Sequence, residues 1–183
     1  METRQLIIVP QVSSVPGHQA LAGRLLRWLV QSGVVEAVPS AFGRGGNRAL
    51  HAPAAGARRV VEHPERLPIG QPGCGLEIVD KRCIYTPVRG FLNEAGCPEC
   101  RREIGEPLFD SLEAWWPGET DNFTCPECGF EDDINGFLYL QPCGFSNLAF
   151  IFNHWAEAGF TRAFLDGFAD RLGFPVRVVR VED

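Results

Sequence analysis

Two copies of the sequence Cys-Pro-Glu-Cys, at residues 97–100 and 125–128, constrain this chain more than any other feature. A Cys-x-x-Cys turn directs two thiolates toward one point, and two such turns that face each other complete a tetrahedral shell. The two motifs are separated by 24 residues. We therefore predict one metal site whose ligands are Cys97, Cys100, Cys125 and Cys128.

Both motifs resemble the Cys-Pro-x-Cys-Gly knuckle of zinc ribbons and rubredoxin-like modules. Gly129 stands at the glycine position of the second knuckle, whereas Arg101 occupies that position in the first. A glycine there permits a tight left-handed residue close to the sulfur atoms. The resemblance implies one structural Zn²⁺ per chain, because four cysteines fill the shell and leave no position open for water.

A redox dithiol pair and an iron site are the alternatives for these cysteines. A redox Cys-x-x-Cys motif normally occurs singly at the start of a helix, and here the motif occurs twice. Iron accepts the same ligands as zinc, but an iron-bearing electron carrier is expected as a small stand-alone ribbon. The other three cysteines, Cys74, Cys83 and Cys143, are expected to pack in the core.

The composition predicts a soluble globular protein. Among 183 residues 45% are hydrophobic, and no segment approaches the roughly 18 uninterrupted apolar residues of a membrane span. An odd count of seven cysteines suits metal ligation in a reducing compartment, and Glu2 stands where a signal peptide carries basic residues. We expect a cytoplasmic protein without membrane contact. Lys81 is the single lysine among 17 basic residues, which is typical of a GC-rich bacterial genome.

The apolar pattern predicts an α+β fold with a small mixed sheet. Strands are expected at 6–9, 34–38, 148–152 and 176–181, with helices at 17–31 and 160–172 packed on one sheet. Strand–helix–strand at both ends forms a pseudo-repeat. We assign residues 1–90 and 136–183 to this α/β body and 91–135 to an inserted zinc ribbon. Residues 39–75, rich in Gly, Pro and Ala, are expected to form a long loop.

Charge is distributed unevenly along the chain. Residues 1–90 carry a net charge of +5, whereas residues 91–135 carry −10. Such asymmetry indicates either a docking face for a basic partner or complementarity between the insert and the body. In the second case Arg24, Arg27, Arg82 or Arg89 would pair with carboxylates of the insert.

The insert carries the candidates for contact with another protein. A ribbon has too small a core to bury two adjacent tryptophans easily, so one of them is expected to serve as an exposed anchor, unless both pack at the junction with the body. The candidate residues are Trp115, Trp116, Glu131, Asp132 and Asp133.

These features leave three classes of function open. The sequence favours a non-enzymatic zinc-binding protein that acts through protein–protein interaction, as a regulator, an adaptor or an immunity-type inhibitor. A nucleic-acid-associated factor would use the basic loop residues Arg44, Arg48, Arg58 and Arg59 on phosphates, although a solvated loop explains them as well. An enzyme would need a pocket in the body, where His154 follows a strand but no nucleophile motif accompanies it. We predict no catalytic residues.

Overall fold

A four-stranded antiparallel sheet forms the body of the protein in the computed structural model, which describes residues 4–42, 48–87 and 91–182. The strands lie in the order β12 (Val176–Glu182), β1 (Arg4–Pro10), β11 (Ala149–Asn153) and β4 (Gly75–Val79). Three of the four predicted strands therefore share one sheet. Every pair of neighbouring strands in this sheet is antiparallel, so the prediction of a mixed sheet is wrong. Strands β11 and β12 run in the same direction, but β1 lies between them and is antiparallel to both.

Residues 34–38 do not form the predicted strand. Val34 donates its backbone N–H to the carbonyl of Leu29 at 2.9 Å, and Val35 makes a single bridge to Pro53. This segment therefore closes the end of the preceding helix instead of joining the sheet, whose edge is formed by β4. Without a strand after the first helix, the two ends of the chain do not repeat one another.

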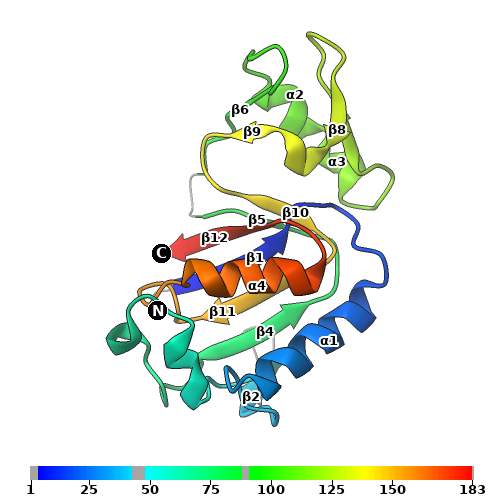
Figure 1. Ribbon diagram of the computed structural model, residues 1–183. Helices are drawn as coiled ribbons and strands as arrows, with labels where there is room; N and C mark the ends of the chain where they lie inside the picture. Colours follow the sequence, from blue (N-terminus) through cyan, green and yellow to red (C-terminus); the bar gives the residue numbers. More distant parts are fainter. Residues whose placement is uncertain (1–3, 43–47, 88–90, 183) are drawn as a thin grey trace.

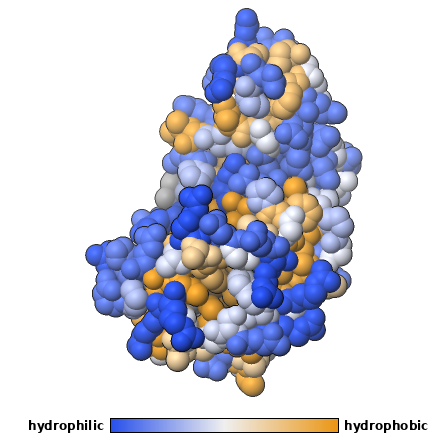
Figure 2. All heavy atoms as spheres, viewed as in Figure 1, coloured by the Kyte–Doolittle hydropathy of each residue, from blue (hydrophilic) through white to orange (hydrophobic). Residues whose placement is uncertain are grey.

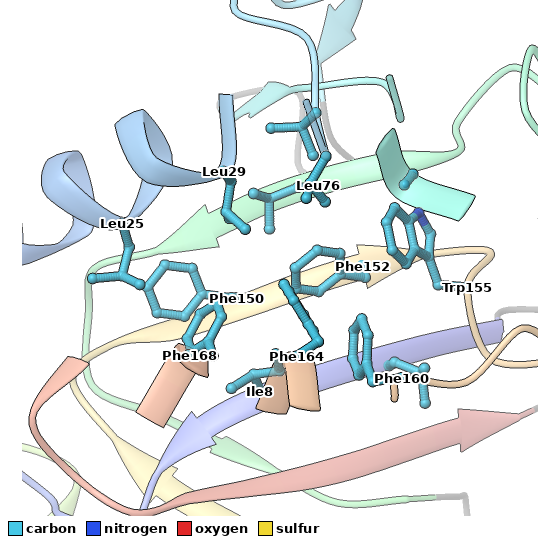
Figure 3. Close-up of a cluster of buried hydrophobic side chains, with 14 of the residues drawn as sticks. Ile8, Leu25, Leu29, Leu76, Phe150, Phe152, Trp155, Phe160, Phe164 and Phe168 are labelled. Atoms are coloured by element: carbon cyan, nitrogen blue, oxygen red, sulfur yellow. The ribbon is translucent and has the colours of Figure 1, made fainter. Parts of the chain in front are cut away.

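Two helices cover one face of the sheet, as the sequence predicted (Figure 1). Helix α1 (His18–Gln31) contributes Leu25 and Leu29 to the core, and helix α4 (Arg162–Leu172) contributes Phe164 and Phe168 (Figure 3). Thr161 begins α4 by accepting the N–H of Phe164, and Gly173 ends it in the left-handed conformation, with φ 87°. Within the described ranges, no helix is long and apolar enough to cross a membrane.

The region 39–75, predicted to be a long loop, contains short elements that pack on the body within its described residues 39–42 and 48–75. It contains short strands β2 (Ala41–Phe42) and β3 (Ala49–Leu50) and 3-10 helices η1 (Ala55–Arg59) and η2 (Pro64–Arg66). Leu50, Val61 and Leu67 are buried in the same core as the two helices. Local periodicity does not reveal such a segment, because its order comes from contacts with the body.

A second hydrophobic core lies in the cysteine-bearing part of the chain, at the far end of the molecule from helix α1 in Figure 1. The chain leaves the body through β5 (Cys83–Tyr85) and returns through β10 (Gly144–Ser146), and these strands pair antiparallel. We call residues 91–143, between these strands, the cysteine module. Its core takes in Phe137 and Cys143 together with Phe145 of β10, beyond the boundary at residue 135 that charge suggested. Its elements are β6 (Ala95–Gly96), α2 (Gly105–Asp110), α3 (Leu112–Trp115), β7 (Asn122–Thr124), β8 (Glu131–Asp133), η3 (Ile134–Gly136) and β9 (Leu138–Tyr139).

Candidate metal centre

The four predicted ligands come together in the cysteine module. Cys97 and Cys100 lie in the turn after β6, and Cys125 and Cys128 lie in the turn between β7 and β8. All four Sγ atoms lie within 4.8 Å of one another. The cluster can hold a metal ion, in agreement with the zinc-ribbon resemblance.

The sulfur spacing matches a tetrahedral metal site. A tetrahedron with metal–sulfur bonds of about 2.3 Å separates its sulfur atoms by about 3.8 Å. Here the Sγ atoms of Cys97 and Cys128 are 3.6 Å apart, and those of Cys100 and Cys125 are 3.7 Å apart. A disulfide would require about 2.05 Å. The arrangement therefore fits four thiolates around one ion.

The two knuckles have the same backbone geometry despite their different sequences. In the first, Arg101 donates its N–H to the carbonyl of Cys97 at 3.0 Å; in the second, Gly129 donates to Cys125 at 2.9 Å. Both donors have left-handed backbones, with φ 62° at Arg101 and 81° at Gly129. The arginine therefore adopts the conformation that the glycine position demands.

Electrostatics within the cluster disfavours four thiolates without a cation. Burial raises the pKa of Cys125, but backbone N–H groups of Cys128 and Glu127 and the neighbouring thiols outweigh it and bring the pKa to about 7. The backbone of Phe130 lowers the pKa of Cys128, yet desolvation and the other thiols raise it to about 12. The neighbouring thiols influence one another's ionisation, and a bound cation would stabilise all four thiolates together.

The cluster has no position for catalysis if all four sulfurs bind one ion. A tetrahedral ion with four cysteine ligands has no site for water or substrate. Cys97 and Cys125 are buried, whereas Cys128 is exposed. The arrangement is therefore suited to holding two hairpins together, with one edge of the site open to solvent.

The remaining cysteines lie apart from this cluster. Cys74 and Cys143 are buried, and Cys83 is half-buried. Burial raises the pKa of Cys74 to about 11 and that of Cys143 to about 12, although nearby groups partly oppose it. With these raised pKa values Cys74 and Cys143 stay protonated at neutral pH, in keeping with the prediction that they pack in the core.

The two adjacent tryptophans have opposite environments. Trp115 is 1% exposed, packs edge-on against Phe145 and donates its indole N–H to the hydroxyl of Ser13 at 2.8 Å. Trp116 is 51% exposed. Trp115 therefore joins the cysteine module to the body, and Trp116 is the one available to a partner.

The side chain of Arg82 completes this junction. Its guanidinium lies 4.4 Å from the ring centroid of Trp115, and its Nε donates to the carbonyl of Trp115 at 2.7 Å. It also pairs with Asp121 and donates to the carbonyl of Thr120. Arg82 thus provides the complementarity between body and insert that the charge distribution suggested. Arg89 lies outside the described residues.

The carboxylates of the insert divide into two groups. Asp121 pairs with Arg82, and Asp133 accepts hydrogen bonds from the backbone and hydroxyl of Ser13. These two therefore hold the module to the body, although the sequence placed Asp133 with the docking residues. The exposed carboxylates are Glu94, Glu99, Glu103, Glu106, Asp110, Glu113, Glu119, Glu127, Glu131 and Asp132.

The described basic loop candidates differ in their surroundings. Arg44 lies outside the described residues. The Nε of Arg48 donates to Glu77 at 3.1 Å, and Glu77 is only 1% exposed. Since a buried carboxylate needs its cationic partner, Arg48 serves the body. Arg58 and Arg59 lie exposed on η1.

His154 lies beside a hollow of about 660 Å³ at the end of β11. Its φ of 65° is left-handed, and Arg4, Arg66 and Glu157 also line the hollow. Arg4 and Glu157 form an ion pair there. This is a place in the body where the enzymatic alternative would find a pocket, and no serine, threonine, cysteine or lysine is among the described residues that line it.

The structure reveals exposed apolar residues that the sequence reasoning missed. Leu92, Leu138 and Leu140 are 51%, 44% and 59% exposed and lie on the β6–β9 pair and its continuation. The sequence signal is the continuous apolar run from Phe137 to Leu140, but a run of this kind does not show which face of the strand is covered.

No known protein family, characterised protein or solved structure matches this chain. The likeness to zinc ribbons therefore depends on the two knuckles and on the sulfur cluster that they form.

Proposed function

We propose that this protein binds one structural Zn²⁺ through its four clustered cysteines, and that the zinc-folded module is a surface for binding another protein. The observation that carries the proposal is the cluster of four Sγ atoms within 4.8 Å. Such a closed thiolate site contributes folding free energy rather than chemistry.

The choice of zinc follows from the ligands and their setting. Four thiolates suit both zinc and iron, but the site sits in a module embedded in a larger body, and a structural role needs no redox change. Elemental analysis of protein purified from its native host tests this choice. We expect one zinc per chain; stoichiometric iron, or no metal, would contradict it.

The exposed groups of the module support a role in binding. Trp116 is half-exposed, and aromatic residues of this kind are enriched among the side chains that dominate interface energies. The exposed carboxylates of the module favour a basic partner and would speed association by about 10- to 1,000-fold at low salt. A non-enzymatic regulator, adaptor or inhibitor would use such a surface.

Capture from extracts of the native host tests the interaction. The bait is the zinc-loaded full chain, and the test variants are Trp116→Ser and the pair Glu131→Lys and Asp132→Lys. Asp133 is left unchanged because it binds Ser13. We expect one protein to be retained by the wild type and reduced by at least one of the variants, with Arg162→Ala on the exposed side of α4 as the control. Retention that no variant changes would count against the proposal.

A further inference from the structure

The outer face of the β6–β9 pair is an apolar strip without a partner in the described chain. Leu138 and Leu140 point away from the module core, whereas Tyr139 between them packs against Phe109 and Phe145. A strand with one solvated face normally carries polar residues on that face. Figure 2 shows hydrophobic atoms at the surface where β6 and β9 lie.

The opposite strand continues the same strip. Gly96 pairs with Leu138, so it adds no side chain that would cover the leucine. Leu92 donates its backbone N–H to the side chain of Gln141 at 3.1 Å and adds a third exposed leucine. We call Leu92, Leu138 and Leu140 the leucine strip.

An acidic hollow borders the leucine strip. A hollow of about 320 Å³ beside Leu138 and Leu140 shares Glu94 and Glu103 with a second hollow of about 520 Å³. The second hollow is lined by Asn93, Glu94, Glu103, Glu106, Phe109 and Asp110. Four carboxylates and an aromatic ring therefore line this hollow, and none of the described residues that line it is basic.

The carboxylate at the boundary is held in place. Oε1 of Glu103 accepts the N–H of Gly105 at 2.8 Å and that of Ala95 at 3.2 Å. The smaller hollow is also lined by Arg101 and Arg102, and Arg102 forms an exposed ion pair with Glu127. Among the described residues that line the two hollows there are four carboxylates and two arginines, so negative charge exceeds positive charge there, and Glu103 is held in position.

We infer that the leucine strip and its acidic hollow bind a segment of another protein in which apolar residues alternate with lysine or arginine. This inference rests on the proposed function and names the partner's chemistry. Apolar side chains would cover the leucines, and cationic groups would enter the hollow beside Phe109. A second copy docked by the same face would oppose carboxylate to carboxylate, and nucleic acid or an anionic membrane would meet the same repulsion.

The test uses the zinc-loaded full chain and a capped pentapeptide, Lys-Leu-Lys-Leu-Lys, as the probe. Amide chemical shifts are followed by NMR during titration to about 1 mM peptide, a range that detects weak contacts. We expect shifts centred on residues 92–96, 103–110 and 138–141. Lys-Ser-Lys-Ser-Lys and Glu-Leu-Glu-Leu-Glu test whether both the apolar and the cationic groups are required.

Matched variants locate the site. The pair Leu138→Ser and Leu140→Ser should weaken binding about tenfold, because both side chains lose apolar contact. The pair Glu94→Gln and Glu106→Gln should weaken it about threefold and flatten its salt dependence. The control pair Glu113→Gln and Glu119→Gln removes the same charge elsewhere in the module and should leave binding unchanged. All variants change exposed residues, and retained zinc shows that they fold.

Several outcomes would overturn the inference. The inference is wrong if the probe does not bind or if it shifts only amides elsewhere in the chain. It is also wrong if the acidic peptide binds as well as the probe, or if the control pair weakens binding as much as Glu94→Gln and Glu106→Gln. A dimer, detected by sedimentation, that Leu138→Ser dissociates would assign the face to a second copy instead. If the peptide fails but host capture still depends on Trp116, the proposed function stands and only this face is excluded.

Discussion

At the scale of single residues, Arg101 has a left-handed backbone that the turn of the knuckle requires but that a residue with a side chain adopts only at a cost. Its φ is 62°, close to the 81° of Gly129 in the matching knuckle. A residue with a Cβ atom costs about 1–2 kcal/mol in this conformation, whereas glycine adopts it freely. The first knuckle therefore keeps its geometry because the hydrogen bond from Arg101 to Cys97 and the proposed metal ion compensate for the strain.

This strain makes a prediction about metal retention. Replacing Arg101→Gly should relieve it and stabilise the metal-bound module by about 0.5–1 kcal/mol, after the greater freedom of glycine in the unfolded chain is subtracted. Competition with a colorimetric zinc chelator measures the change. Gly129→Ala, which introduces strain in the second knuckle, should act in the opposite direction. Faster zinc loss from Arg101→Gly than from the wild type would show that the arginine itself supports the site.

At the scale of elements, the module is built from short pieces that depend on one another. Strands β7 and β8 are three residues each, and β6 and β9 are two residues each. Strands of this length are not stable alone. The cysteine cluster and the small second core therefore provide most of the order of residues 91–143, while the body relies on the long strands β1 and β12.

Loss of one metal ligand should destabilise the core of the cysteine module much more than the core of the body. In Cys125→Ser the metal no longer binds tightly, and we expect the amides of β6 to β9 to exchange hydrogen much faster, because metal-binding free energy is folding free energy here. The amides of β1, β11 and α4 should change little. Hydrogen exchange followed by mass spectrometry measures both regions at once. Cys83→Ser, outside the cluster, is the control, and equal protection of the module in both variants would contradict the prediction.

At the scale of the whole molecule, a set of polar contacts around Arg82 and Trp115 holds the module to the body. The side chain of Arg82 is largely buried between the module and the body, where it contacts Trp115, Thr120 and Asp121. Ser13 on the body meets both Trp115 and Asp133. The bond from Trp115 to Ser13 is buried and the contacts of Arg82 are partly buried, so they fix the orientation of the module more strongly than fully exposed pairs can.

Removal of the Arg82 side chain should therefore weaken the whole protein. We expect Arg82→Ala to lower the free energy of unfolding by about 2–3 kcal/mol, because Asp121 and the carbonyls of Trp115 and Thr120 lose their donor. Urea denaturation followed by tryptophan fluorescence measures the change. Arg102→Ala removes an exposed pair with Glu127 and should cost less than about 0.5 kcal/mol. Similar losses in the two variants would mean that the junction contributes little.

The cysteine cluster, the main helices and three strands of the sheet were predictable from the sequence. Metal-ligand spacing is a local property of the Cys-x-x-Cys turn, and the periodic apolar residues of α1 and α4 identify their buried faces without knowledge of the partner. The short apolar runs at 6–9 and 148–152 are likewise sufficient to predict buried strands.

Other features were decided by tertiary contacts alone. The choice of β4 as the edge strand, the burial of Trp115 rather than Trp116, and the use of Asp133 at the junction all depend on residues far apart in the chain. Trp115 finds its hydrogen-bond acceptor, Ser13, 102 positions away. The leucines at 138 and 140 look like core residues in the sequence, and only the structure shows that the side of β9 on which they lie is left uncovered. Composition and spacing describe what a segment can bury, whereas the packed fold determines which of its faces is buried.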